Sequence, residues 1–186
     1  MILLINACVR RESRTKRLAD RLLAKKAGPV EEVRLIDIDF PAVDEAFLNK
    51  SDRLIAAGRF DAPTFALARQ FASADEIVIA APFWDLSFPA SLKQYFEQIN
   101  VVGITFRYTP EGVPEGLCNA KKLTCVATAG GDFFPEEYGF GYIRALAQSF
   151  YGIQSVELVK ATGLDIVGRD PEAILDAVIP DGEQPK

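Results

Sequence analysis

Three short apolar runs constrain this chain more than any other feature of its sequence. They cover residues 2–5, 77–81 and 123–127, and Thr124 is the one polar residue among them. Apolar runs of this length are typical of strands that helices cover on both faces. Residues 33–35 and 156–159 instead alternate apolar with charged residues, as expected at the edge of a sheet. The chain is therefore predicted to contain three central strands and two edge strands.

Helical patterns separate these strands. Apolar residues recur at intervals of three and four within residues 15–23, 65–72, 92–99 and 140–150. Ser13 is a predicted helix N-cap, and Pro63 and Pro89 fit the first turns of later helices. This alternation predicts an α/β fold, a doubly wound five-stranded parallel sheet with helices on both faces. Because the second and fifth strands have edge character, the predicted strand order is 2-1-3-4-5.

The length of the chain fits one domain, so residues 1–186 are predicted to form a single unit. An extra helix is expected over residues 47–57, and an insertion or flap with a strand or hairpin at about residues 101–121. A flexible tail is expected at about residues 180–186. The first residues resemble a strand rather than a signal peptide, and no apolar run is long enough to cross a bilayer. A cytoplasmic protein without membrane contact is therefore expected.

The composition excludes several classes of chemistry. The chain has no histidine, which removes Ser-His-Asp and Cys-His catalysis, histidine–zinc sites and imidazole acid–base steps. Its three cysteines form no C-x-x-C pair, so no disulfide framework and no metal site is indicated. A net charge of −5 disfavours a nucleic-acid partner. Any chemistry must come from carboxylates, a thiol or a bound cofactor.

The predicted strand order brings the loops after the first, third and fourth strands to one crevice. In the first of them, loop 8–15, Ser13 and Thr15 lie at a helix N-terminus beside Arg10, Arg11 and Arg14. Hydroxyl groups, free amides and cations in this arrangement suit a phosphate monoester. The loop lacks the glycines of dinucleotide-binding and Walker A motifs. A capping serine on a solvated basic face is the alternative interpretation.

The other two loops suit a flat ring system. Loop 81–89 holds three aromatic residues and two prolines at the mouth of a central strand. Loop 128–134 contains Gly130 and Gly131, which permit close approach of the backbone to a ligand. A hydrophobic plug and a plain tight turn are the respective alternatives. Because the fold places all three loops side by side, a shared ligand is favoured.

Several segments resemble a known family. Residues 77–96, 103–108, 112–117 and 128–131 are similar, in the same order, to segments of the flavodoxin-like NAD(P)H dehydrogenase (quinone) and FMN-dependent azoreductase family. The resemblance covers about residues 1–165. It implies a flavodoxin-like fold, FMN as cofactor, NADH or NADPH as donor and a homodimer with two sites at its interface. It also implies ping-pong transfer of two electrons to a flat aromatic acceptor (a quinone, an azo or nitro compound, or a flavin), with the flavin rather than a side chain carrying the chemistry.

The resemblance also assigns roles to individual residues. The FMN phosphate would be held by Ser13, Arg14 and Thr15, with Cys8 where azoreductases often have serine. The isoalloxazine ring would lie along Pro82, Phe83, Trp84, Asp85 and Leu86, of which Trp84-Asp85 replaces the Tyr-Asn of many relatives. Its pyrimidine edge would bond to Thr128, Ala129, Gly130 and Gly131. The acceptor pocket would be formed by Phe106, Tyr108 and Phe134. Phe106 and Tyr108 would come either from the same chain or from the partner subunit of the dimer.

Two other functions stay open at this point. Cys8-x5-Arg14-Thr15 matches the C-x5-R-[ST] loop of low-molecular-weight tyrosine phosphatases, and Asp170-Pro171 is similar to their general-acid segment. That loop would have to surround a phosphoryl group without any glycine and with the Glu12 carboxylate inside it. A flavodoxin-type electron carrier is the second alternative. The acidic net charge suits it, whereas loop 8–15 lacks the Thr- and Gly-rich composition of a flavodoxin phosphate loop.

Overall fold

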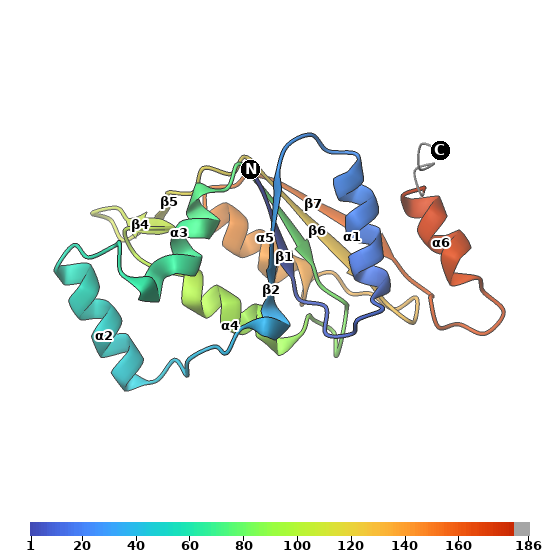
Figure 1. Cartoon of the computed structure of the whole chain (residues 1–186), viewed down its shortest axis with the longest axis horizontal. Coiled ribbons are helices and arrows are strands. Elements are labelled where there is room, and N and C mark those ends of the chain that lie inside the picture. The colour runs from blue at the N-terminus through green and yellow to red at the C-terminus, as the bar shows by residue number, and fades with distance from the viewer. Residues whose placement is uncertain (181–186) are drawn as a thin grey trace.

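Five strands form one parallel sheet in the computed structural model of the chain, which describes residues 1–180 (Figure 1). They are β1 (Ile2–Asn6), β2 (Val30–Arg34), β3 (Glu76–Ala80), β6 (Lys122–Thr128) and β7 (Ser155–Ala161). Their order is β2-β1-β3-β6-β7, and every neighbouring pair is parallel. The predicted order 2-1-3-4-5 is confirmed, because β6 and β7 are the fourth and fifth strands of this sheet along the chain. Residues 181–186 of the predicted tail lie outside the described residues.

Burial along the strands explains this order. Every residue of β1 is buried, and Glu76 is the one residue of β3 that is not. In contrast, β2 buries only Val33 and β7 buries only Ala161. A strand that is apolar on both faces needs neighbours and helices on every side, so β1 and β3 occupy the middle of the sheet. The two charged strands take the edges.

Helices cover both faces of the sheet. They are α1 (Arg14–Ala24), α2 (Glu45–Ala56), α3 (Ala66–Ser73), α4 (Ala90–Ile99), α5 (Phe140–Ser149) and α6 (Pro171–Val178), with short 3-10 turns at Leu35–Asp37 and Pro63–Phe65. In β1, Ile2 and Leu4 pack in the core cluster that includes residues of α1 and α6. Leu3 and Ile5 pack in the cluster that includes residues of α3, α4 and α5. Alternation along each strand thus divides the core into two layers.

Two elements stand apart from the sheet. Helix α2 buries none of its residues and lies at one end of the molecule (Figure 1). It begins two residues before the helix expected at residues 47–57. The second element is an antiparallel hairpin of β4 (Phe106–Tyr108) and β5 (Pro114–Gly116) within residues 101–121. No helix in residues 1–180 combines the length and apolar character needed to cross a membrane.

The hairpin packs at the edge of the sheet where the strands begin. After β5 the chain bonds to the segment that leads into β3, through the Asn119 N–H to the Ala72 carbonyl (2.9 Å). Gly116 lies against the backbone of Tyr151 and Gly152, which precede β7. The opposite edge, where the strands end, is therefore left to the loops that follow β1, β3 and β6.

Replacing Gly116 tests the packing of this hairpin. Gly116→Ala is expected to lower the free energy of unfolding by about 1–3 kcal/mol, because the added Cβ would lie 2.5 Å from the Tyr151 carbonyl oxygen and closer still to the Gly152 nitrogen. Urea unfolding followed by circular dichroism measures the change. Glu115→Ala at the exposed neighbouring position is the control and is expected to leave the unfolding midpoint almost unchanged. Equal effects of both substitutions would contradict the close packing at Gly116.

Candidate functional site

Three loops meet at the carboxyl edge because the hydrogen-bond ladder of the sheet continues past the strands. The N–H of Ala7 donates to the carbonyl of Ala80, the last residue of β3 (2.8 Å). On the other side of β3, the Ala81 N–H donates to the Val126 carbonyl (3.0 Å), and the Phe83 N–H donates to the β6 end at the Thr128 carbonyl (2.9 Å). Backbone bonds therefore fix the starts of the three loops side by side.

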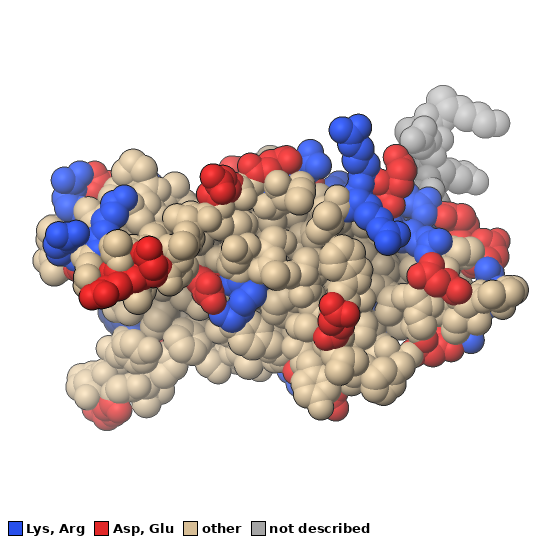
Figure 2. Space-filling model, turned by 90° about the horizontal axis from the view of Figure 1, so that it is seen from below, with Lys and Arg blue, Asp and Glu red and all other residues tan. Residues whose placement is uncertain are grey.

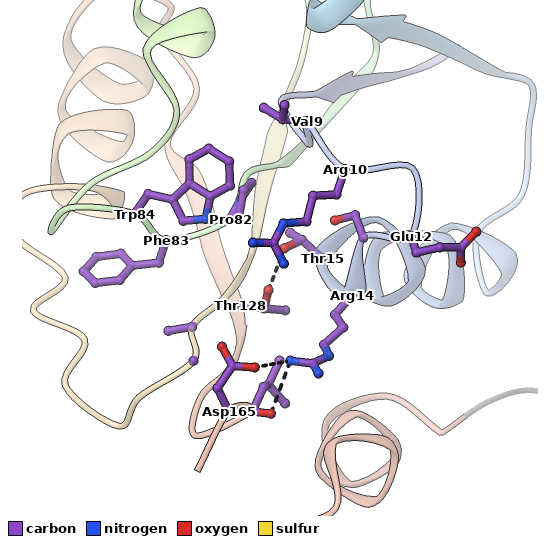
Figure 3. A pocket seen from close by; sticks show the side chains of 14 residues that line it. Val9, Arg10, Glu12, Arg14, Thr15, Pro82, Phe83, Trp84, Thr128 and Asp165 are labelled. Atoms are coloured by element: carbon purple, nitrogen blue, oxygen red, sulfur yellow. Dashed lines mark hydrogen bonds and ion pairs between the residues drawn. The ribbon is translucent and has the colours of Figure 1, made fainter. Parts of the chain in front are cut away.

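A cavity of about 290 Å³ opens between these loops (Figure 3). Its volume lies near the lower end of the range for small-molecule sites. Among the residues that the sequence assigns to the cofactor, the cavity is lined by Ser13, Arg14, Thr15, Pro82, Phe83, Trp84, Thr128, Ala129 and Gly130. The lining is completed by residues outside that prediction, which are Val9, Arg10, Glu12, Leu164 and Asp165.

The N-terminus of α1 forms one wall of the cavity. The Lys16 N–H donates to the Ser13 hydroxyl oxygen (3.3 Å), so Ser13 is the N-cap that the sequence predicts. The first N–H groups of a helix have no partner within it, so this wall is a source of hydrogen-bond donors. The hydroxyls of Thr15 and Thr128 share a buried hydrogen bond of 2.6 Å. This bond joins the first turn of α1 to the end of β6.

Trp84 reaches the cavity on a tight and strained turn. Trp84 and Ser87 exchange backbone hydrogen bonds of 3.0 and 2.7 Å across Asp85 and Leu86. Asp85 and Leu86 have φ values of +48° and +67°, the left-handed conformation that costs a residue such as leucine about 1–2 kcal/mol. Strain of this kind clusters at binding sites. Trp84 lines the cavity, whereas Asp85 and Leu86 do not.

Phe134 supports the aromatic wall and does not line the cavity itself. The centroid of its ring lies 4.2 Å from the centroid of the Phe83 ring, with an angle of 30° between the two ring planes. The ammonium group of Lys160 lies 5.2 Å from the centre of the Phe134 ring. The structure thus places Phe134 against a lining residue instead of in the open space of the cavity.

The loop after β7, residues 162–169, contributes a further wall that was not predicted from the sequence. Three of its N–H groups donate to carbonyls of loop 128–134, from Gly163 to Gly131 (3.0 Å), from Leu164 to Ala129 (3.2 Å) and from Asp165 to Gly130 (2.9 Å). Only the loops after the three central strands were predicted to form the crevice. The signal that could have revealed this wall is the position of β7, which neighbours β6 and ends at the same edge.

Two ion pairs fasten loop 162–169 to its neighbours. Arg14 of α1 donates to the Asp165 carboxylate (2.6 Å) and to the Leu164 carbonyl (3.2 Å). Arg169 donates to both carboxylate oxygens of Asp132, at 2.7 and 2.8 Å. Hydrogen bonding by Arg169 holds the pKa of the Asp132 carboxyl below its ordinary value. The cavity wall therefore depends on charges that lie far apart in the sequence.

Cys8 and Gly131 lie next to the cavity without lining it. The Cys8 thiol is buried and lies 3.7 Å from the Ala80 carbonyl oxygen. Burial raises the pKa of this thiol above its ordinary value. Gly131 instead uses its carbonyl to accept the hydrogen bond from Gly163. The structure thus gives Cys8 and Gly131 supporting positions behind the lining.

Phe106 and Tyr108 do not approach the cavity of their own chain. Both belong to β4, and the hairpin lies at the edge of the sheet where the strands begin (Figure 1). Phe106 is buried and packs edge-on against Phe150, with 4.7 Å between ring centroids. Tyr108 is half exposed. Within one chain, these two aromatic residues and the three loops form separate regions.

Comparison with known proteins identifies the fold family. Residues 1–180 match a protein family whose description is a flavodoxin-like fold. The chain belongs to this flavodoxin-like family. The flavodoxin-like protein is 39% identical over 170 residues to an FMN-dependent NADH:quinone oxidoreductase of Clostridium perfringens, covering 87% of this chain and 84% of the relative. It is 35% identical over 185 residues to an FMN-dependent NADH:quinone oxidoreductase of Coprothermobacter proteolyticus, covering 93% of this chain and 90% of the relative.

A solved structure agrees with this family. The crystal structure of an azoreductase from Bacillus anthracis superimposes on the flavodoxin-like protein with a TM-score of 0.81 at 26% sequence identity. The match covers 96% of this chain and 94% of the azoreductase. The fold is thus shared over nearly the whole length of both chains.

The buried hydroxyl pair of the flavodoxin-like protein gives a test of how the site is joined. Thr128→Val is expected to lower the free energy of unfolding by about 1–3 kcal/mol, because it leaves the buried Thr15 hydroxyl without its partner. Thr15→Val/Thr128→Val removes both hydroxyls and is expected to recover part of that loss. Chemical denaturation of the wild type, both single variants and the double variant yields the coupling energy. A coupling energy of zero would show that the two hydroxyls act independently.

Proposed function

We propose that this protein is an FMN-dependent NADH:quinone oxidoreductase. The observation that carries the proposal is the composition of one cavity, in which a helix N-terminus with hydroxyls and arginines faces an aromatic wall and a glycine-containing loop. The names of the relatives from Clostridium perfringens and Coprothermobacter proteolyticus support FMN as cofactor, NADH as donor and quinones as acceptors. The azoreductase structure supports azo compounds as further acceptors.

One end of the cavity fits the phosphate of FMN. Ser13 lies at the cap of α1, where its oxygen accepts from the Lys16 N–H and its hydroxyl hydrogen can turn from the neighbouring Cys8 thiol to an anion. The unpaired amides and the positive end of the helix dipole favour an anion at this position. Arg10 and Arg14 add cationic groups to the same part of the lining. Hydrogen-bond donors and positive charge thus gather where the phosphate would lie.

The other end of the cavity fits a flat ring with a polar edge. Pro82, Phe83 and Trp84 provide an apolar and aromatic surface along one side. Ala129 and Gly130 present their backbone on the adjacent side. A Cβ at Gly130 would force the Asp165 carboxylate to move, because it would lie 3.1 Å from the Asp165 Cγ and closer still to a carboxylate oxygen. The absence of a side chain keeps the backbone of this loop accessible to a ligand.

In this proposal the protein contributes binding and orientation, and it needs no acid–base side chain. Bound FMN would supply the redox chemistry, by taking two electrons from NADH and giving them to the acceptor in a ping-pong sequence. The chain contains no histidine, and the Asp165 carboxylate of the cavity lining is already paired with Arg14. The residues of the cavity would hold the phosphate, and Trp84 would restrain the plane of the flavin ring. The outer side of the ring would stay open to donor and acceptor.

A homodimer completes the acceptor pocket in this proposal. Around the loops, Trp84, Leu86, Phe133 and Tyr138 are between 41% and 75% exposed, which is unusual for large apolar side chains. Tyr108 lies at the far edge of its own chain, so it reaches a cavity only in a second copy. Because Phe106 is already packed against Phe150, Tyr108 is the residue of the two that is free to cover a partner's site.

A phosphatase is disfavoured by the place of Cys8. A catalytic cysteine of that type must attack as the thiolate from within the anion site. Here the thiol is buried and lies beside a neighbouring hollow that Arg14 does not line, and burial raises its pKa. The geometry therefore leaves Cys8-x5-Arg14 as a spacing match without the arrangement that the chemistry needs.

Flavin binding is the direct test of the proposed function. Trp84 is the only tryptophan of the chain and lines the cavity, so added FMN is expected to quench its fluorescence in a saturable manner. Addition of NADH to the loaded protein without oxygen should bleach the visible flavin bands, and a quinone should restore them. An azo dye in place of the quinone tests the second acceptor class. Wild-type protein that shows no saturable FMN binding would overturn the proposal.

The phosphatase alternative has its own assay. The wild type is expected to show no hydrolysis of p-nitrophenyl phosphate above that of Cys8→Ser, because the buried thiol and the Arg14 guanidinium line different hollows. Initial rates of p-nitrophenolate release measure this. Turnover that disappears in Cys8→Ser would instead restore the phosphatase interpretation.

A further inference from the structure

Arg10 and Arg11 precede α1, and Arg14 is its first residue. The three arginines differ in whether they line the cavity and in whether an acidic side chain binds them. Arg10 and Arg14 line the cavity, whereas Arg11 does not. Arg14 is bonded to the Asp165 carboxylate (2.6 Å). Within residues 1–180, Arg10 forms no ion pair with a carboxylate. The family resemblance gives the phosphate to Arg14 alone among the three; in the structure, Arg10 is the one that both lines the cavity and is unpaired among the described residues.

The position of Arg10 suits an anionic ligand. Figure 3 shows its side chain extending from loop 8–15 into the space between Trp84 and Arg14, toward the Thr15 hydroxyl. Glu12 also belongs to the lining, but its carboxylate extends away from that space in the same view. Arg10 thus brings a guanidinium group beside the N-terminus of α1 with no acidic side chain between them.

Arg14 instead forms part of a row of ion pairs between α1 and the C-terminal segment. It is the first of three arginines on one stripe of α1, each of which pairs with an acidic residue of the C-terminal segment: Arg14 with Asp165 (2.6 Å), Arg17 with Glu172 (2.6 Å) and Arg21 with Asp176 (2.7 Å). Their spacing of three and four residues places them on the same side of the helix. Figure 2 shows basic and acidic side chains interleaved on this side of the molecule. The stripe joins α1 to loop 162–169 and α6.

The Asp165 side chain that pairs with Arg14 also lies beside the Gly130 backbone. The Asp165 carboxylate that Arg14 holds lies against Gly130, with 3.1 Å between the Asp165 Cγ and the place of a Gly130 Cβ. To move its guanidinium onto a phosphate, Arg14 would have to give up the bonds that its Nη1 donates to the Asp165 carboxylate and to the Leu164 carbonyl. Arg10 has no such bond to give up. A bound phosphate therefore gains more from Arg10 than from Arg14.

We propose that Arg10 is the side chain that binds the phosphate of the flavin, and that Arg14 is a positioning residue that holds loop 162–169 against Gly130. This assignment rests on the proposed function, since it requires FMN in the cavity. It divides between two residues a role that the sequence gives to Arg14. Arg10 then determines the preference for a phosphorylated flavin over riboflavin, and Arg14 contributes to the shape of the cavity for both.

Paired titrations with FMN and riboflavin test the role of Arg10. Arg10→Gln is expected to weaken FMN binding at least tenfold, because a charge-assisted hydrogen bond is lost, and to change riboflavin binding less than twofold. Quenching of Trp84 fluorescence measures both dissociation constants. Arg11→Gln is the matched control, with the same charge change in the same loop, and should alter FMN affinity less than twofold. An equal loss in both variants would show that only the net charge of the loop matters and would overturn the assignment.

A second set of variants tests Arg14. Arg14→Gln/Asp165→Asn removes the ion pair without leaving an unpaired carboxylate, and it is expected to weaken FMN and riboflavin binding by the same factor. Arg14→Lys keeps a cation beside Asp165 and should restore most of the affinity for both ligands. If the double variant lost affinity for FMN but kept its affinity for riboflavin, Arg14 would be the residue that binds the phosphate, and the proposal would be overturned. Circular dichroism and thermal melts establish that each variant is folded.

The outcomes for the two proposals are distinct. If the wild type fails to bind FMN, the proposed function is lost. If the wild type binds FMN and Arg10→Gln binds it equally well, the function stands and the assignment of Arg10 is wrong. A steeper dependence of FMN affinity on salt in the wild type than in Arg10→Gln would give independent support, because the guanidinium–phosphate contact is screened by ions.

Discussion

The parallel pairing of β1, β3 and β6 is the constraint on which the rest of the structure depends. These strands are apolar on both faces, so helices must cover both sides and their connections must return to the same edge. The backbone ladder then continues beyond the strands, from Ala7 to Ala80 and from Phe83 to Thr128. The loops that form the cavity are held together by the same bonds that build the sheet. The site is an extension of the hydrogen-bond ladder of the sheet.

Electrostatics adds a second level of organisation around this edge. The acidic chain concentrates arginines on one stripe of α1, and each of the three is paired with a carboxylate from the C-terminal segment. Exposed pairs of this kind contribute little to stability one by one. Their effect here is positional, because they join loop 162–169 to α1 and leave Arg10 facing the cavity. The paired arginines of α1 shape the site, whereas the Arg10 guanidinium is available to a ligand.

The sequence was sufficient for the features that follow from local pattern. Apolar runs predicted the strands and their order, Ser13 was predicted as the N-cap, and three loops were predicted at one edge. The contribution of Asp165 was missed, because it depends on a pairing with Arg14 across more than a hundred residues. The strained turn at Asp85 and Leu86 was missed for a related reason: neither residue type favours positive φ enough to predict it from the sequence.

By itself, then, the sequence determined the sheet, its edge and the kinds of side chain that gather there, because burial and periodicity are local properties of a chain. Only the tertiary structure decided which of those side chains share a cavity. It placed Trp84 in the lining and Asp85 outside it, moved Phe106 and Tyr108 to the opposite edge, and bonded Arg14 to Asp165. Such distinctions depend on contacts between segments far apart in the sequence, and no pattern within one segment contains them.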